Sequence, residues 1–176
     1  IVPEKFTQQK LNNFLVRDQF VNYYHVPNIK TAKMLRQITK KPIEIISYWW
    51  NEKLWTPYSK TKARNEMKIS LTDFCIGSFQ RDTEGSDLKT PKLEKGPDLF
   101  CDYIEKIYEH KKDLNILLGG WRRQYVVNRL KSKKINFTLF EKTSLETIKK
   151  LYACCDLYIV SSRYEGGPQA IIEAAA

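Results

Sequence analysis

The chain has 176 residues, 42% hydrophobic and 12% aromatic, which excludes a disordered tail and supplies a core for one domain and part of a second. Two histidines leave almost no material for a histidine-based metal site or a Ser-His-Asp triad, and no apolar run approaches the roughly 20 residues of a membrane helix. The net charge of +10 favours anionic partners (nucleic acid, phosphorylated small molecules or an acidic membrane surface) without choosing among them.

The first sixty residues predict the last units of an α/β domain. Helices are expected at about 5–16 and 31–39, and strands at 20–24 and 43–48. A turn at residues 55–58 then leads into a polar connector at 59–68. We therefore expect two domains, one formed by residues 1–58 and one by residues 59–176.

Strands and helices alternate four times after residue 69. The expected strands are residues 73–79, 114–118, 135–140 and 156–161. The expected helices are residues 98–112, 121–131, one that follows a capping box of Thr143 and Glu146, and one that opens at Pro168. Short apolar strands without polar alternation are typical of a parallel sheet covered on both faces, so we predict an α/β fold with a doubly wound, Rossmann-like sheet.

Ligands of such a sheet bind beyond the carboxyl ends of its strands. This rule points to the loops after Phe79, Leu118, Phe140 and Ser161. The loop at residues 80–97 is long and polar, and loops of that length are usually functional or mobile.

The four cysteines show neither zinc nor redox spacing, which predicts reduced, mostly buried thiols in an intracellular protein. The chain starts without a basic-then-apolar leader and ends on three alanines without a helix stop. We expect both ends to continue in a longer protein.

The segment at residues 161–176, SSRYEGGPQAIIEAAA, carries the strongest chemical pattern. Gly166 and Gly167 let a ligand approach the backbone, and the N–H groups of the following helix favour an anion. Glu165 and Glu173 could hydrogen-bond hydroxyls, so a ligand with both phosphate and sugar hydroxyls fits. A tight strand-to-helix turn with two solvated glutamates explains the same residues.

Ser161-Ser162, Glu165-Gly166 and Glu173-Ala174 resemble the signature of retaining glycosyltransferases with the GT-B fold, of glycosyltransferase family 4 (group 1). Further matches over about residues 25–176 include Lys95-Gly96-Pro97-Asp98. The resemblance implies that residues 1–58 are the tail of an N-terminal, acceptor-side domain with the interdomain stretch. It implies that residues 59–176 are a nucleotide-sugar-binding, Rossmann-like domain truncated at its C-terminus.

The resemblance also implies a hexosyltransferase-type enzyme that needs no metal or other cofactor and takes a nucleotide-diphosphate sugar as donor. Glu165 would be the catalytic residue beside the transferred sugar. The implied donor-binding residues are Arg81, Lys95, Gly166, Gly167, Gln169 and Glu173, of which Lys95 and Arg81 would neutralise the diphosphate and Glu173 would hold the ribose. Phe140 and Lys142 would lie near the base.

The implied acceptor is a glycan or glycolipid, and lipid-linked acceptors imply peripheral contact with the cytosolic face of a membrane in the cytoplasm. This chain alone is expected to bind donor but to transfer sugar poorly or not at all. Nucleic acid is not an expected partner of such an enzyme. Two alternatives stay open: a non-enzymatic, basic Rossmann-like module that binds nucleic acid or anionic membrane, and a catalytically silent glycosyltransferase-like subunit.

Overall fold

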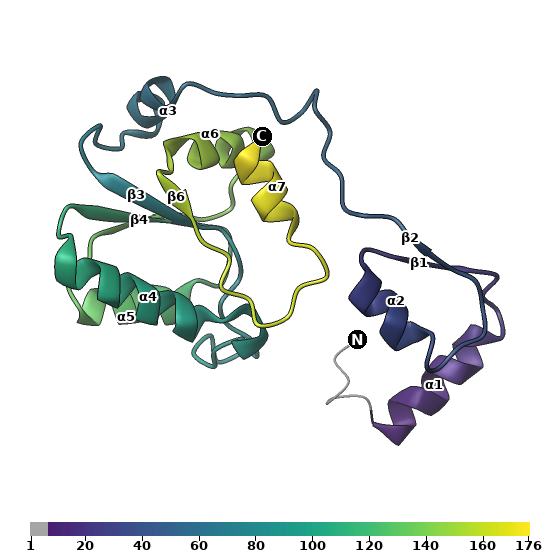
Figure 1. The fold of residues 1–176 in the computed structure, drawn as a ribbon. Coiled ribbons are helices and arrows are strands. Elements are labelled where there is room, and N and C mark those ends of the chain that lie inside the picture. The colour runs from purple at the N-terminus through teal and green to yellow at the C-terminus, as the bar shows by residue number, and fades with distance from the viewer. Residues whose placement is uncertain (1–6) are drawn as a thin grey trace. The chain divides into compact units, whose positions relative to one another are not determined.

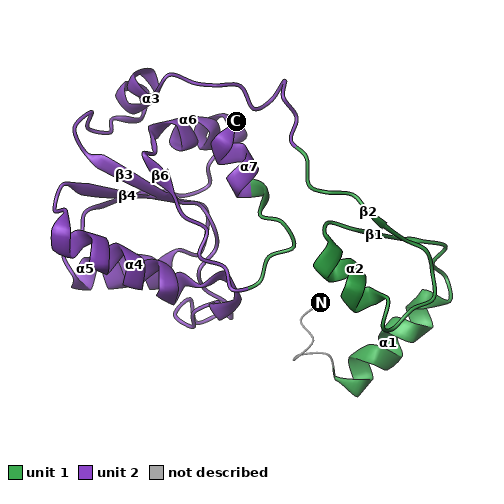
Figure 2. Ribbon diagram, in the orientation of Figure 1, with its two compact units in different colours: residues 1–49, 164–169 green, residues 50–163, 170–176 purple. Residues whose placement is uncertain are grey.

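The computed structural model describes residues 7–176, which form two compact units (Figures 1 and 2). Unit 1 comprises the chain up to Trp49 together with residues 164–169, and unit 2 comprises residues 50–163 and 170–176. The boundary between the units thus falls before the domain boundary expected at residue 58. Whether these units act as acceptor-side and donor-side domains stays a prediction.

Unit 1 is a small parallel βαβ arrangement. Its elements are α1 (Gln8–Asp18), β1 (Tyr24–Val26), α2 (Ile29–Leu35) and β2 (Ile43–Ile45). β1 and β2 pair in parallel around a cluster of Val26, Ala32 and Leu35. The strand expected at 20–24 was misplaced, because Phe20 and Val21 close the end of α1 through N–H bonds to its last carbonyls. The expected helix start at residue 5 lies outside the described residues.

Unit 2 carries a four-stranded sheet. Its strands are β3 (Phe74–Ser78), β4 (Leu114–Gly119), β5 (Phe137–Phe140) and β6 (Leu157–Tyr158). Its helices are α3 (Lys60–Met67), a 3₁₀ helix (Leu93–Lys95), α4 (Pro97–His110), α5 (Gln124–Ser132), α6 (Leu145–Cys154) and, apart from its first residue, α7 (Gln169–Ala175). The strand order is β5-β4-β3-β6 and every pairing is parallel.

Both faces of this sheet are covered, as the uninterrupted burial of β4 requires. Ile116 and Leu118 pack with α4 and α5 on one face, whereas Leu117 packs with α3 and α6 on the other (Figure 1). The predicted doubly wound, Rossmann-like α/β fold is confirmed. Buried, unpaired thiols were also expected, and Cys75, Cys101 and Cys154 are free and buried, with Cys155 partly so.

Two local predictions in unit 2 were wrong. The polar connector at residues 59–68 is largely the helix α3, whose N-cap Ser59 accepts a bond from the N–H of Lys62. Its buried face consists of Ala63 and Arg64, so the sequence shows no apolar stripe. At α6 the N-cap is Ser144 rather than Thr143, because the Ser144 hydroxyl accepts the N–H of Thr147 at 3.2 Å.

Arg64 explains why a polar helix packs against this sheet. The side chain is only 4% exposed, and its Nε and Nη2 atoms donate to the carbonyl of Cys154 at 3.1 and 2.9 Å. Nη2 also contacts the carboxylate of Asp156 at 2.7 Å, and that carboxylate accepts the N–H of Cys75 at 2.8 Å. One guanidinium therefore joins α3, the end of α6 and the starts of β3 and β6.

Replacing Arg64 by Leu should lower the free energy of unfolding by about 2–4 kcal/mol, because the buried Cys154 carbonyl loses both of its donors and Asp156 keeps only Lys60 as a cationic partner. Urea denaturation followed by circular dichroism measures this change. The matched control is Lys62→Leu on the same helix, where an exposed ion pair with Glu66 is lost and a change below about 1 kcal/mol is expected. Equal effects of the two substitutions would contradict the assignment.

Candidate functional site

Gln80, two residues after the end of β3, ties the two ends of the 80–97 loop to the loop after β6 at the carboxyl edge of the sheet. Its Nε2 donates to the carbonyl of Lys95 at 2.8 Å and to the hydroxyl of Ser161 at 3.1 Å. The Ser161 hydroxyl also donates to the Lys95 carbonyl at 3.1 Å, and Ser162 donates to Gln80 Oε1 at 3.2 Å. The backbone of Lys95 is therefore fixed where the chain leaves β3 and β6.

Gly96 permits this arrangement. Its φ is 60°, and a Cβ at this position would lie 2.0 Å from the carbonyl oxygen of Ser161. A side chain would collide with backbone there, in addition to the cost of the left-handed conformation. The Lys-Gly pair predicted from the sequence thus has a packing reason that is independent of any ligand.

A buried acid holds the other end of the 80–97 loop. The Asp82 carboxylate accepts the N–H groups of Tyr125 and Val126, both at 3.3 Å, and so caps the first turn of α5. Arg123, 1% exposed, places its Nε 3.4 Å from this carboxylate and donates through Nη2 to the hydroxyl of Ser78 at 3.2 Å. The long loop is therefore anchored at the ends of β3 and β4.

Burial raises the pKa of Asp82 to about 6, against the opposing effects of Arg123 and of the two N–H donors. Burial likewise lowers the pKa of Arg123 from its ordinary value. Desolvation outweighs attraction for both members of the pair, as is common for buried ion pairs.

The two predicted diphosphate cations have different surroundings. Lys95 is half-buried and is fixed through its carbonyl by Gln80 and Ser161. Arg81 is exposed, and its Nε donates to the carbonyl of Thr83 at 2.6 Å within the same loop. The expectation that both reach one diphosphate stays a prediction.

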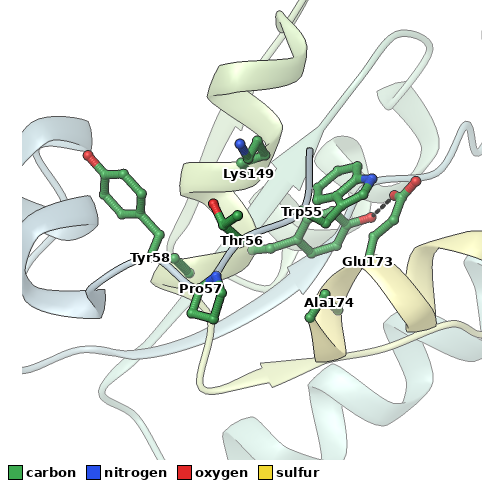
Figure 3. A pocket seen from close by; sticks show the side chains of 10 residues that line it. Trp55, Thr56, Pro57, Tyr58, Lys149, Glu173 and Ala174 are labelled. Atoms are coloured by element: carbon green, nitrogen blue, oxygen red, sulfur yellow. Dashed lines mark hydrogen bonds between the residues drawn. The ribbon is translucent and has the colours of Figure 1, made fainter. Parts of the chain in front are cut away.

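Glu173 on α7 meets Tyr152 on α6, whose phenol donates to Oε2 at 3.0 Å (Figure 3, dashed line). The carboxylate borders a cavity of about 210 Å³ in unit 2. Labelled side chains around it include Trp55, Tyr58 and Lys149 (Figure 3). Glu173 is therefore a partly buried, hydrogen-bonded group rather than a glutamate in bulk water.

The predicted base contacts lie after β5. Phe140 is half-buried against the cluster under α6, and its carbonyl accepts the N–H of Gly120 at 3.0 Å. Lys142 is exposed with a φ of 49°. Contact of either residue with a base stays a prediction.

The loop at residues 164–169 belongs to unit 1 by its contacts. The Gly166 carbonyl accepts the amide of Asn28, and Gln169 Nε2 donates to the Trp49 carbonyl at 2.8 Å. A Cβ on Gly167 would lie 2.3 Å from the ring of Tyr48. Close passage of a tyrosine thus explains the second glycine without a ligand. Glu165 in the same loop is exposed.

Sequence reasoning missed Gln80, Asp82, Arg123 and Tyr152 as organisers of this edge. Gln80 carried a usable signal, because it is a polar residue directly after a buried strand whose carboxyl end was expected to bind ligand. The contact between Asp82 and Arg123 joins positions far apart in the chain, and no local sequence pattern predicts it.

A doubly wound parallel sheet with polar loops gathered at its carboxyl edge defines a Rossmann-like domain, a fold whose ligands bind at that edge. The family model described as "Glycosyl transferases group 1" matches residues 89–176, which is half of the chain. The chain therefore belongs to the group 1 glycosyl transferases. A comparison with curated proteins found no match.

Three solved structures share the fold. Anabaena HepE in complex with UDP and glucose matches with a TM-score of 0.75 and 18% identity over 98% of this chain and 47% of that chain. Sucrose-phosphate synthase from Thermosynechococcus elongatus matches with a TM-score of 0.75 and 17% identity over 98% of this chain and 44% of that chain. A glycosyltransferase from Rickettsia africae matches with a TM-score of 0.65 and 18% identity over 98% of this chain and 46% of that chain. The chain thus spans less than half of each of these proteins.

Two features are absent from the described residues, 7–176. None of the helices in this range has the length and apolar character to cross a membrane. In the same range, no three or more His, Cys, Asp and Glu side chains gather as a metal-binding group.

Replacing Gly96 by Ala should lower the free energy of unfolding by about 2–5 kcal/mol, because strain at positive φ adds to the collision with Ser161. Gly85→Ala is the matched control: its φ is 72°, but the nearest atom to its Cβ would be 3.6 Å away. That control should cost only about 1–2 kcal/mol. Thermal and urea unfolding of both variants give the comparison, and equal costs would show that the Ser161 contact is unimportant.

The carboxyl of Asp82 should titrate near pH 6 in the folded protein. Its folded pKa lies above the value of about 3.9 for an unfolded chain, so the folded state holds a proton that the unfolded state has released. This contribution to stability is present below about pH 4 and is lost as the pH rises through 6. Carbon-13 NMR of the side-chain carboxyls measures the midpoint.

Asp87 is the internal control for that titration. It lies exposed in the same loop, and the Thr90 hydroxyl, with two backbone N–H groups, holds the pKa of Asp87 below its ordinary value. A midpoint for Asp82 as low as that for Asp87 would contradict the dominance of burial at the Arg123 pair.

Proposed function

We propose that the chain is the donor-binding part of a retaining, metal-independent glycosyltransferase that takes a nucleotide-diphosphate sugar. The observation that carries the proposal is the fixed position of Lys95 at the carboxyl edge of the sheet. Gln80, Ser161 and the left-handed Gly96 hold its backbone there. A cation at that edge stands where ligands of doubly wound sheets bind.

The chemistry needs such a cation. When the bond between the anomeric carbon and the diphosphate oxygen breaks, the electron pair leaves with the diphosphate, and its negative charge grows in the transition state. A positive group that is already in place stabilises this charge without having to reorganise. Lys95 supplies it, with Arg81 as a second cation if its loop brings it to the same phosphates. We accordingly propose that no metal or other cofactor takes part.

The remaining roles follow the family signature. Glu173 accepts the ribose hydroxyls of the donor, and Glu165 lies beside the transferred sugar, with Gly166, Gly167 and Gln169 lining the donor. Phe140 and Lys142 contact the base. The donors to test include a uridine nucleotide, because the structure of HepE contains UDP and glucose.

We propose that a hexosyl group is transferred to a glycan or glycolipid in the cytoplasm, at the cytosolic face of a membrane. The net charge of +10 supports contact with anionic headgroups. Because the chain spans less than half of the related structures, we expect donor binding by this chain and little or no transfer.

Titration calorimetry with UDP-, GDP- and ADP-sugars tests the proposal on the chain itself. We expect one nucleotide to bind, with no change in affinity on adding EDTA. Lys95→Ala should weaken that binding about tenfold or more, because a charge-assisted contact to phosphate is worth roughly 1.5–3 kcal/mol. Lys89→Ala, an exposed lysine in the same loop, is the control and should leave the affinity unchanged.

The proposal fails if no nucleotide sugar binds, or if Lys89→Ala weakens binding as much as Lys95→Ala. Salt-sensitive binding of oligonucleotides in place of nucleotide sugars would favour the non-enzymatic binding module instead.

A further inference from the structure

Tyr152 on α6 and Glu173 on α7 lie 21 positions apart in the sequence, and their side chains are in contact. The phenol on α6 donates to one carboxylate oxygen on α7 at 3.0 Å. A carboxylate has room for several hydrogen-bond donors on its two oxygens, so one bond leaves capacity for a ligand. The contact therefore orients Glu173 without saturating it.

The ring of Tyr152 is itself fixed by three other aromatic side chains. The ring centroids of Phe79 and Tyr158 each lie 5.0 Å from that of Tyr152, and Trp55 packs edge-on at 5.7 Å. The Tyr158 hydroxyl accepts the N–H of Phe79 at 3.3 Å. Phe79 follows β3 directly, so its contacts fix the position of the Tyr152 phenol relative to the carboxyl edge of the sheet.

The phenol stays a donor at every working pH. Burial first, and then the nearby Tyr158 and Glu173, raise the pKa of Tyr152 far above its ordinary value. A protonated phenol beside a carboxylate makes a charge-assisted bond, which is shorter and stronger than a neutral one.

We propose that Tyr152 is a positioning residue for ribose recognition: it holds the Glu173 carboxylate in the orientation that accepts the ribose hydroxyls of the donor. The inference rests on the proposed function, because it assigns a partner to the same glutamate. It makes Tyr152 a determinant of the preference for ribonucleotides over 2′-deoxyribonucleotides. A purely structural tyrosine would affect both kinds of nucleotide equally.

The experiment compares the dissociation constants of a nucleoside diphosphate and its 2′-deoxy analogue. The base is the one that binds in the titrations with UDP-, GDP- and ADP-sugars. The unsubstituted chain should prefer the ribonucleotide about tenfold, the value of one charge-assisted hydrogen bond. Tyr152→Phe keeps the ring in its aromatic cluster and removes only the donor, and it should reduce the preference to about threefold or less. In a Glu173→Ala background, Tyr152→Phe should change the preference no further.

Tyr58→Phe is the matched control. Tyr58 lines the same cavity, but its hydroxyl donates to Glu66 on α3, at 3.0 and 3.1 Å from the two carboxylate oxygens. The Tyr58→Phe variant should prefer the ribonucleotide as strongly as the unsubstituted chain does. Thermal melting of each variant shows that the folded state is intact, and the Glu173→Ala background supplies a second measurement if Tyr152→Phe melts early.

The outcomes separate the two claims. A full ribonucleotide preference in a folded Tyr152→Phe variant overturns the inference and leaves the proposed function standing. Binding of the diphosphate without any ribonucleotide preference in the unsubstituted chain also overturns the inference alone, because Glu173 then does not read the ribose. Absence of all nucleotide binding overturns the proposed function, and the inference with it.

Discussion

The close approach of Gly96 to the Ser161 carbonyl is the constraint on which this edge of the sheet depends. Without a Cβ at residue 96, the 3₁₀ helix comes against the chain leaving β6, and its last carbonyl, on Lys95, receives two side-chain hydrogen bonds. A larger residue would move the 3₁₀ helix outward and separate the loops that Gln80 joins. The position of the lysine backbone is thus set by packing and by hydrogen bonds to its carbonyl.

Much of the fold could be predicted because its signals are local. The four strands of unit 2 and helices such as α4 follow from apolar runs and periodicity that each segment carries by itself. The helix α3 could not be predicted in this way, since the group that it buries is the guanidinium of Arg64. That burial is favourable only with Asp156 and the Cys154 carbonyl in place. A tertiary contact decided the secondary structure there.

The candidate site likewise has parts with local sequence signals and parts that depend on tertiary contacts. The Glu-Gly-Gly loop could be singled out from the sequence because it combines glycine and charge at a strand-to-helix junction, and the Lys-Gly pair because it resembles a family motif. The reason for Gly167 could not be foreseen, since the ring that passes it belongs to Tyr48, over a hundred positions earlier. The pairing of Asp82 with Arg123 is likewise visible only after the loop has folded over the end of β4.

Charge balance connects these observations. A carboxylate near a diphosphate is repelled by it, so Glu173 can serve such a ligand only if hydroxyls, and not phosphate oxygens, reach it. A neutral phenol as its partner satisfies this requirement better than a lysine would. Tyr152 stabilises the carboxylate through a hydrogen bond while leaving its charge available to polarise a hydroxyl. A lysine at residue 152 would neutralise that charge and attract phosphate to the wrong end of the ligand. The cation that we propose for the diphosphate therefore stands on a separate loop, at Lys95.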